Sequence, residues 1–365
     1  MVTASRSGDL PDRVRRLLAD ADRDEAVAPV VVGALPFNAT SQPHVFQPDR
    51  WVRRLPTSNV HAPWPEAPGR HPERWTVRAV PPRADYRRAE AAALAAMAQD
   101  DTPRKVVLAR TLQLDADAPI DPALLFSRLS IYRAVTTFAV PLRPCAGGQA
   151  RALIGATPEL LAAKQGLAVS SRPLAGSARR RPAASDDRDA AETLARSEKD
   201  RREHATVVEW IADRLAPFCR TLKVPHSPSL VSTASMWHLG STIEGTLRDP
   251  DTSSLEVALA LHPTPAVCGT PHDWAATTID ALEPFDRDFY AGAVGWNDAR
   301  GNGEWFVAIR CAEICGASAR LFAGAGIVRG SSPAAEAAET SAKFVALLRA
   351  LGIDEEGRTF SGADL

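Results

Sequence analysis

The chain has 365 residues, of which 45% are hydrophobic and 24% are charged, a composition typical of soluble globular proteins. Its 43 Lys and Arg residues and 44 Asp and Glu residues give a formal net charge of −1, which excludes a bulk attraction to nucleic acid or to an anionic membrane. The longest early apolar stretch, 26–37, contains two prolines and is shorter than the about 20 residues that span a bilayer, so we expect a cytoplasmic protein with no membrane partner.

The N-terminal part begins with a short amphipathic segment, followed by a strand-like run at 30–35. A Pro-rich stretch at 43–82 contains Trp51, Trp64 and Trp75, too many large apolar groups for a solvated linker. We interpret this stretch as ordered irregular structure that packs on the core.

Helix and strand signals then alternate without strict βαβ order. An Ala-rich helix is predicted at 85–99 and a long helix at about 188–217. Strands are predicted at 105–112, 152–154, 160–163, 167–170, 304–310 and 320–328, with a hairpin turn at Gln165 and Gly166. A last helix opens with Ser332 as N-cap and Pro333 at its first position, closes near Leu351 with Gly352 as C-cap, and leaves an acidic, frayed tail after 353.

This order of elements favours an α+β fold with extensive antiparallel sheets flanked by helices. No internal repeat or low-complexity block separates domains, so 1–365 is expected to form a single large domain.

The cysteines are odd in number and widely scattered, which argues against a disulfide scaffold. Cys311 and Cys315 lie close together, but no second pair completes a zinc site. Free thiols are predicted for all five cysteines, which are Cys145, Cys219, Cys268, Cys311 and Cys315.

Two predicted helices carry acids in line with an apolar stripe. In the helix at 188–217, Asp200 and Glu203 precede apolar residues at a spacing of four, and in the last helix Glu336 and Glu339 precede Lys343. An inward carboxylate needs a cation, a metal or a proton, and Mg²⁺ prefers oxygen ligands. The alternative is a set of exposed acids that pair with Lys or Arg at i,i+4.

Four further features are candidates for a site. Lys105 starts a strand that looks apolar on both faces, where burial favours the neutral amine of a general base; a lysine at an exposed strand end is the alternative. Glu159 precedes an apolar run and is either a buried acid or an exposed turn residue. Glycine-rich loops are predicted at 174–177 and 323–326, where backbone N–H groups can approach an anion. His238 is either a ligand-binding residue or a core histidine.

Taken together, these segments resemble the chorismate-utilising enzymes, and among them the isochorismate synthases. The resemblance is strong over 85–352, faint over 30–84, and absent from the first 30 residues. The matching segments are VVGALPF (31–37), RKVVLAR (104–110), GATPELL (155–161), SRPLAGSARR (171–180), SEKDRREH (197–204), WHLGSTIEG (237–245), LHPTPAVCGTP (261–271), DRDFYAGAVGW (286–296), AIRCAEI (308–314) and RLFAGAGIVRGSSPAAEAAETSAKF (320–344).

The resemblance implies a role for each matching residue. Lys105 matches the lysine that activates water for attack at carbon 2 of chorismate, and Glu159 matches the acid that protonates the hydroxyl leaving carbon 4. The implied cofactor is Mg²⁺, with Glu203 and Glu339 as direct ligands and Asp200 and Glu336 as acids that hold its waters or support its ligands. Positions that match substrate-binding residues are Gly176, Ser177, His238, Ala266, Tyr290, Arg310, Gly324, Gly326 and Lys343.

The resemblance also narrows the reaction. Lys105 implies water rather than ammonia as nucleophile, and Ala175 stands where aminodeoxychorismate relatives carry a nucleophilic lysine. Ser177 resembles isochorismate synthases, whereas salicylate synthases tend to threonine; salicylate synthase, which adds pyruvate elimination, is the alternative. A catalytically silent chorismate-binding protein is the other alternative, and the presence of both Lys105 and Glu159 argues against it. We expect a monomer, and the resemblance leaves open whether the enzyme serves a siderophore, menaquinone or other biosynthetic pathway.

Overall fold

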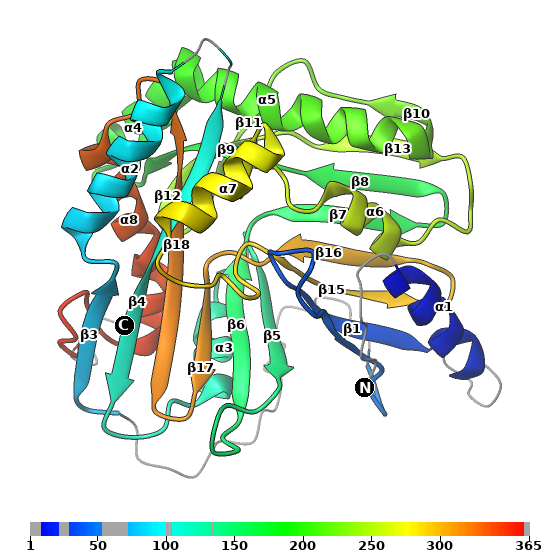
Figure 1. Cartoon of the computed structure of the whole chain (residues 1–365), viewed down its shortest axis with the longest axis horizontal. Helices are drawn as coiled ribbons and strands as arrows, with labels where there is room; N and C mark the ends of the chain where they lie inside the picture. Colours follow the sequence, from blue (N-terminus) through cyan, green and yellow to red (C-terminus); the bar gives the residue numbers. More distant parts are fainter. Residues whose placement is uncertain are drawn as a thin grey trace.

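The computed structural model describes residues 9–21, 29–52, 72–99, 102, 104–132 and 134–360, and it confirms the predicted α+β class. In these residues the strands pair antiparallel in three sheets, and helices pack on the outside of the sheets (Figure 1). The helices are α1 (Leu10–Ala21), α2 (Arg83–Met97), α3 (Pro122–Leu129), α4 (Ala184–Arg196), α5 (Glu198–Leu215), α6 (Ser254–Leu261), α7 (His272–Leu282) and α8 (Pro333–Leu351), with a short 3₁₀ turn, η2 (Ala216–Phe218).

An eight-stranded sheet forms one half of the molecule. Its strands, in spatial order, are β10 (Cys219–Lys223), β13 (Ile243–Leu247), β8 (Ala168–Arg172), β7 (Leu160–Gln165), β16 (Gly303–Val307), β15 (Ala293–Asp298), β1 (Val30–Leu35) and β2 (His44–Phe46). The predicted hairpin joins β7 and β8, with Gly166 at φ 59° in the turn. The apolar stripe of α5, Val207, Ile211 and Leu215, is buried in the same core as Trp305 of this sheet.

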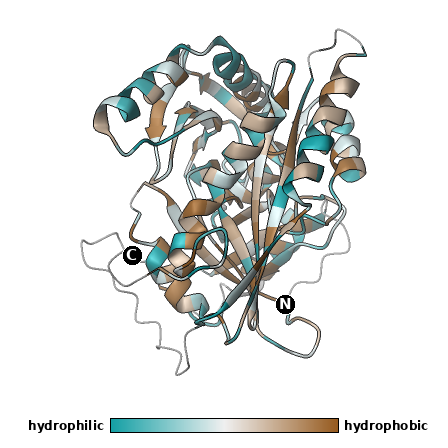
Figure 2. Cartoon of the chain, turned by 90° about the vertical axis from the view of Figure 1, so that its left-hand side faces the viewer, coloured by the Kyte–Doolittle hydropathy of each residue, from teal (hydrophilic) through white to brown (hydrophobic). Residues whose placement is uncertain are grey.

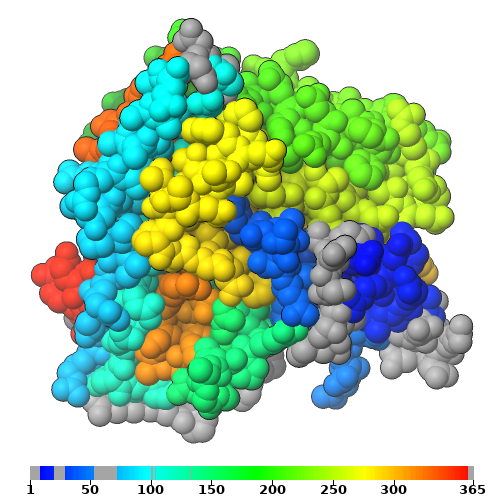
Figure 3. Space-filling model, in the orientation of Figure 1, coloured from blue at the N-terminus to red at the C-terminus, as the bar shows by residue number. Residues whose placement is uncertain are grey.

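A seven-stranded sheet forms the other half. Its strands are β14 (Gly269–Thr270), β4 (Lys105–Ala116), β18 (Ser318–Val328), β17 (Cys311–Cys315), β6 (Arg151–Thr157) and β5 (Thr136–Leu142), with β3 (Trp75–Val80) also paired to β4. The long β4–β18 ladder runs from Lys105 opposite Val328 to Asp115 opposite Ser318. Helices α2, α3, α7 and α8 pack around this sheet. In Figure 3, α7 lies beside α2 on the face shown.

The third sheet contains β11 (Ser229–Ser232), β12 (Met236–Gly240) and β9 (Leu174–Arg179). The predicted glycine-rich loop at 174–177 is wrong, because it forms the start of β9, and the one at 323–326 lies within β18. Glycine is needed here for close approach rather than for a turn: a Cβ at Gly324 would lie 2.9 Å from the Tyr290 hydroxyl.

The predicted long helix at 188–217 is instead two helices. Ser197 adopts an extended conformation between α4 and α5, and its hydroxyl accepts a hydrogen bond from the backbone N–H of Asp200 at 3.3 Å. Ser197 is therefore the N-cap of α5, and the break directs the first turn of α5 towards β9.

The last helix has the predicted ends. Pro333 is its first residue and Gly352, at φ 84°, follows its last turn, although the Ser332 side chain makes no capping hydrogen bond. The prediction of a frayed tail is wrong for residues 353–360, because Ile353 is buried and pairs with Thr359. Residues 361–365 lie outside the described residues.

Two other local predictions are corrected. The strand predicted at 304–310 ends at Val307, because the chain then turns and Arg310 adopts a left-handed conformation with φ 51°. The stretch at 43–82 contains two strands, β2 and β3, with Trp75 in β3; Trp64 lies outside the described residues.

The prediction that all cysteines are free is wrong for one pair. Cys145 and Cys315 form a disulfide, with Cα atoms 6.5 Å apart, while Cys219, Cys268 and Cys311 are free and buried. The pairing arises because β17 lies beside β6, so that Cys315 pairs with Arg151 near the loop that carries Cys145. Sequence separation of 170 residues conceals this proximity.

Apolar residues concentrate on the strands between the layers, and polar residues on the outer helices (Figure 2). No helix in the described ranges is long and apolar enough to cross a membrane.

Candidate active site

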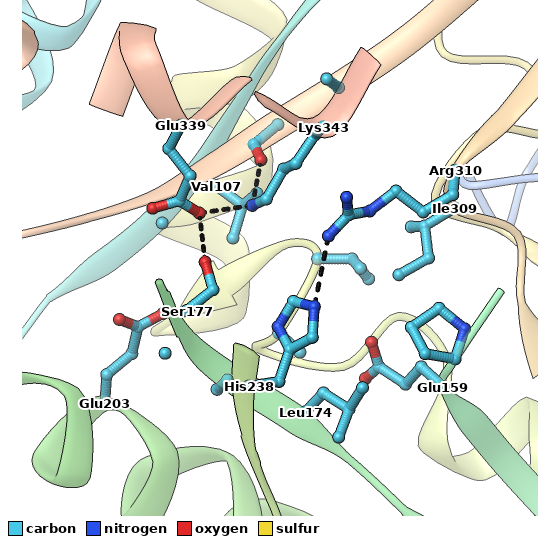
Figure 4. A pocket seen from close by; sticks show the side chains of 18 of the residues that line it. Val107, Glu159, Leu174, Ser177, Glu203, His238, Ile309, Arg310, Glu339 and Lys343 are labelled. Carbon is cyan, nitrogen blue, oxygen red and sulfur yellow. Dashed lines mark hydrogen bonds and ion pairs between the residues drawn. The ribbon is translucent and has the colours of Figure 1, made fainter. Parts of the chain in front are cut away.

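One pocket gathers fourteen of the fifteen predicted site residues, all except Lys105. Its walls come from β4, β9, β12, β18, α5, α8 and the loops that precede β7, β14, β15 and β17. The predicted residues that line it are Glu159, Gly176, Ser177, Asp200, Glu203, His238, Ala266, Tyr290, Arg310, Gly324, Gly326, Glu336, Glu339 and Lys343. Figure 4 shows Glu203 and Glu159 at opposite sides of the labelled group.

Helix α5 contributes two acids to this pocket. The Asp200 carboxylate accepts a hydrogen bond from the Ser197 hydroxyl. Burial, together with the negative charges of Glu203 and Glu339, raises the pKa of the Asp200 carboxyl. Glu203 forms an ion pair with Lys105, with 2.9 Å between Oε1 and Nζ. The first two turns of α5 therefore bring negative charge into the pocket.

Helix α8 contributes two acids from the other side. Glu336 Oε1 lies 3.0 Å from Lys199 Nζ, and burial together with the charge of Glu339 raises the pKa of Glu336. Glu339 Oε1 lies 2.5 Å from Lys343 Nζ and accepts a hydrogen bond from Ser177 Oγ at 2.9 Å (Figure 4). Burial alone raises the pKa of Glu339, but the contacts with Lys343 and Ser177 outweigh it and lower the pKa.

Within the described residues, no three Asp, Glu, His or Cys side chains are arranged to hold a metal ion as they stand. Each of Glu203, Glu336 and Glu339 is instead paired with a lysine. The donor set nevertheless fits a hard divalent cation, because all four acids offer oxygen ligands, and burial together with the charges of neighbouring acids raises the pKa values of Asp200 and Glu336. A cation at this place would relieve that repulsion.

Lys105 lies behind the pocket wall rather than in it. Its side chain is 3% exposed and its amine contacts Glu203. Gly326, on the neighbouring strand β18, leaves room for this pair: a Cβ there would lie 2.6 Å from Glu203 Oε1 and 3.2 Å from Lys105 Cε. The interpretation as an exposed strand-end lysine is therefore wrong, and Lys105 reaches the pocket at the position of Glu203.

Glu159 lies at the other side of the pocket and is buried. Burial raises its pKa to about 7, although the positive charges of Lys105, Lys343 and Arg310 partly oppose the shift. The exposed-turn alternative is wrong, because the residue sits between β6 and β7 with only 3% of its surface exposed. Near neutral pH this carboxyl is populated in both the protonated and the ionised form.

The half-buried Arg310 and the buried His238 form a cationic corner close to Glu159. Arg310 Nη2 lies 3.5 Å from His238 Nε2 (Figure 4). Burial, together with the charges of Arg310 and Lys343, lowers the pKa of His238 well below its usual value. His238 is therefore neutral and acts as an acceptor, so its contact leaves the positive charge of Arg310 available for an anion.

The wall opposite β9 is apolar. The Tyr290 ring stacks on Phe322 with centroids 4.8 Å apart, and both residues line the pocket with Val107. Lys343 Nζ donates a hydrogen bond to the Gly324 carbonyl at 2.7 Å, which directs the lysine amine towards this wall. The pocket therefore combines acids, bases and an apolar surface that suits a small anionic ring compound.

A scan against protein-family models matches residues 49–352 to the chorismate-binding enzymes. The chain belongs to this family. It is 44% identical over 348 residues to isochorismate synthase DhbC of Bacillus subtilis, covering 94% of this chain and 86% of that protein. It is 41% identical over 358 residues to isochorismate synthase EntC of Escherichia coli, covering 95% of this chain and 88% of that protein.

A solved structure has the same fold as this chorismate-binding enzyme. It is described as a putative 2,3-dihydroxybenzoate-specific isochorismate synthase, DhbC, from Bacillus anthracis. The TM-score is 0.88 at 40% sequence identity, and the match covers 97% of this chain and 92% of that chain.

Lys199 is a pocket residue of this family member that the sequence interpretation missed. It lines the pocket, and its contact with Glu336 outweighs the effect of burial and raises its pKa. It stands within the matching segment 197–204, beside Asp200, but a lysine in the first turn of a helix is most often exposed. Only the approach of α8 to α5 in the folded chain gives it an acidic partner.

Proposed function

We propose that the chain is an isochorismate synthase, which converts chorismate to isochorismate. The proposal is supported by 44% identity to an isochorismate synthase, and by a pocket lined by Glu159 and the acids of α5 and α8, with Lys105 buried beside it and paired to Glu203. The curated relatives described above do not support the salicylate synthase alternative.

The reaction is a displacement with an allylic shift. Water adds through its oxygen to carbon 2 of chorismate, and its proton goes to Lys105, which acts as the neutral amine after its ion pair with Glu203 is released. The ring double bonds shift, and the hydroxyl at carbon 4 leaves as water with a proton from Glu159. The pKa of about 7 for Glu159 suits a general acid, because a protonated fraction persists at neutral pH and its proton is readily given up.

Substrate binding is assigned to the cationic and small residues of the pocket. Chorismate is a dianion, and Arg310 and Lys343 offer charge-assisted hydrogen bonds to carboxylates. Gly176 and Ser177 on β9, and Gly324 and Gly326 on β18, allow the substrate to approach the backbone closely. His238, Ala266 and Tyr290 complete the surface around the ring.

The proposed cofactor is Mg²⁺, held by Glu203 and Glu339, with Asp200 and Glu336 holding its waters. When bound, it supplies positive charge beside a substrate carboxylate and withdraws electron density from the ring. In this structure Glu203, Glu336 and Glu339 form ion pairs with Lys105, Lys199 and Lys343, respectively. Because a bound cation would compete for the same carboxylate oxygens, these ion pairs would loosen on its binding.

The product is the first test of this function. Purified protein incubated with chorismate and Mg²⁺ is expected to accumulate isochorismate, measured by chromatography, and to run the reverse reaction from isochorismate. Pyruvate, followed in parallel with lactate dehydrogenase, is expected to appear only slowly. Release of pyruvate in step with chorismate loss would show instead that the pocket completes the elimination and that Ser177 does not distinguish the two reactions.

A second expectation concerns pH. Because the acid form of Glu159 is the active one, its active fraction falls by about tenfold per pH unit above the pKa of about 7, and this contribution to the pH profile of kcat/KM should be missing in Glu159→Gln. The measurement is kcat/KM for chorismate at saturating Mg²⁺ across neutral pH, since this ratio reports groups of the free enzyme. Equal pH profiles for the unsubstituted protein and for Glu159→Gln contradict the assignment of Glu159 as the acid.

A further inference from the structure

Strand β4 carries Lys105 and Val107, and one of its edges is interrupted beside the pocket. On the side away from β18, β14 pairs with Lys105 and Val106, and β3 pairs only from Thr111 onwards. In the described part of the chain, no strand pairs with 107–110 on this edge. The edge peptide groups there need other partners, because buried backbone groups left without hydrogen bonds are costly.

Two charged side chains fill this interruption. Arg287 Nη2 donates to the Val107 carbonyl at 2.6 Å, and Glu283 Oε1 accepts from the backbone N–H of Ala109 at 2.7 Å. Glu283 and Arg287 also form an ion pair through two contacts, at 2.5 Å and 2.8 Å. The two side chains thus supply the hydrogen bonds that a neighbouring strand would otherwise make to the Val107 carbonyl and the Ala109 N–H of β4.

The same arginine reaches two other parts of the pocket wall. Its Nη1 donates to the Val267 carbonyl at 2.8 Å, and its own carbonyl accepts from the backbone N–H of Tyr290 at 2.8 Å. The guanidinium also lies over the Phe37 ring, 4.4 Å from the centroid. Val107, Val267 and Tyr290 all line the pocket, whereas Glu283 and Arg287 do not.

Because the ion pair between Glu283 and Arg287 is buried, even a conservative substitution of either residue should disturb it. The side chains of Arg287 and Glu283 are 2% and 3% exposed. A buried ion pair gains stability only when its geometry and its remaining hydrogen bonds are satisfied, and Arg offers a planar set of donors that Lys lacks. A lysine at position 287 cannot make all the hydrogen bonds that Arg287 makes to the Glu283 carboxylate and to the Val107 and Val267 carbonyls.

We propose that Glu283 and Arg287 are positioning residues that fix the apolar wall of the substrate pocket formed by Val107, Val267 and Tyr290. The inference rests on the proposed function, because it takes chorismate as the molecule that this wall contacts. The pair touches neither the acids of the cation site nor Glu159, so it sets substrate binding rather than the chemistry.

The test is the substitution Arg287→Lys. We expect the KM for chorismate to rise by roughly tenfold or more, with kcat changed by a few-fold at most, because a displaced wall weakens contacts made in both the ground state and the transition state. Kinetics are measured well below the melting temperature of the variant. Glu283→Gln, which keeps an acceptor for Ala109, is the second variant and should raise KM in the same direction.

Lys164→Met is the matched control. Lys164 is a buried cation that also joins backbone carbonyls of two loops, donating to Pro250 at 2.9 Å and Arg300 at 3.0 Å, but it does not line the pocket. It should lower the melting temperature without changing KM. The inference is overturned if Arg287→Lys and Glu283→Gln lower only the maximal rate, in proportion to the folded fraction, with KM unchanged.

A second readout separates this inference from the proposed function. Chorismate should raise the melting temperature of the unsubstituted protein, and the increase should be smaller for Arg287→Lys at the same chorismate concentration. If the unsubstituted protein binds chorismate but makes no isochorismate, the proposed function fails while this comparison still tests the wall. An equal increase in both proteins overturns the inference.

Discussion

Replacing Glu159 by glutamine is expected to lower kcat by about 10²–10⁴-fold, the usual contribution of a general acid. Glutamine has nearly the same shape, so the buried site between β6 and β7 should keep its packing. It cannot release a proton to the hydroxyl that leaves carbon 4. The measurement is steady-state isochorismate formation at saturating Mg²⁺, together with the melting temperature, which should change little.

Glu90→Gln is the matched control for this substitution. Glu90 of α2 is fully buried, its pKa is raised to about 8 by burial, and it does not line the pocket. The substitution therefore replaces another largely protonated carboxyl with an amide, and kcat should stay within a few-fold. If Glu159→Gln keeps a rate close to that of Glu90→Gln, another group supplies the proton.

Local signals were sufficient for much of the fold. Pro333 and Gly352 mark the ends of α8 because proline suits the first helical position and glycine tolerates the left-handed conformation that ends a helix. Spacing of four on α5 predicted which side of the helix is buried, and Glu203 lies at the pocket end of that stripe. Acids in register with apolar stripes therefore indicated the four helical acids of the site, and the other residues did not follow from this pattern.

Features that depend on distant partners were beyond a local interpretation. In the sequence, Ser197 looks like an ordinary residue within one long helix. In the structure it is extended, and its hydroxyl accepts a hydrogen bond from the N–H of Asp200, so that it separates α4 from α5 as an N-cap. The segment at 174–177 looks like a turn because of Gly176, but it pairs with β12 to form β9. Cys145 meets Cys315 only because β6 and β17 are neighbours.

The substrate-binding and catalytic residues were predicted through the resemblance to a family rather than through pattern. Nothing local marks Ala266 or Arg310 as pocket residues, since both lie in irregular segments between elements. Pattern also gave no sign that Lys105 is screened from the pocket by Glu203. These positions are set by strands of two sheets, by two helices and by the loops between elements, which together line the pocket.

The largest remaining effect is expected from the cation site. EDTA should abolish isochorismate formation and excess Mg²⁺ should restore it, and Glu203→Gln or Glu339→Gln should lower kcat by at least about 10²-fold, as removal of a positioned electrostatic group does. Glutamine removes one negative charge while keeping the shape of the side chain. It also leaves Lys105 or Lys343 without its ion-pair partner.

Binding is measured independently of turnover by the rise in melting temperature that Mg²⁺ produces. The unsubstituted protein should be stabilised, because the cation compensates the neighbouring negative charges that, after burial, raise the pKa values of Asp200 and Glu336, and the two glutamine variants should respond less. Glu313→Gln is the control: Glu313 is also ion-paired, with Arg151 and Arg320, but lies outside the pocket, so its response to Mg²⁺ should be normal. Full activity in EDTA, or an equal Mg²⁺ response in all variants, contradicts a cation site at these four acids.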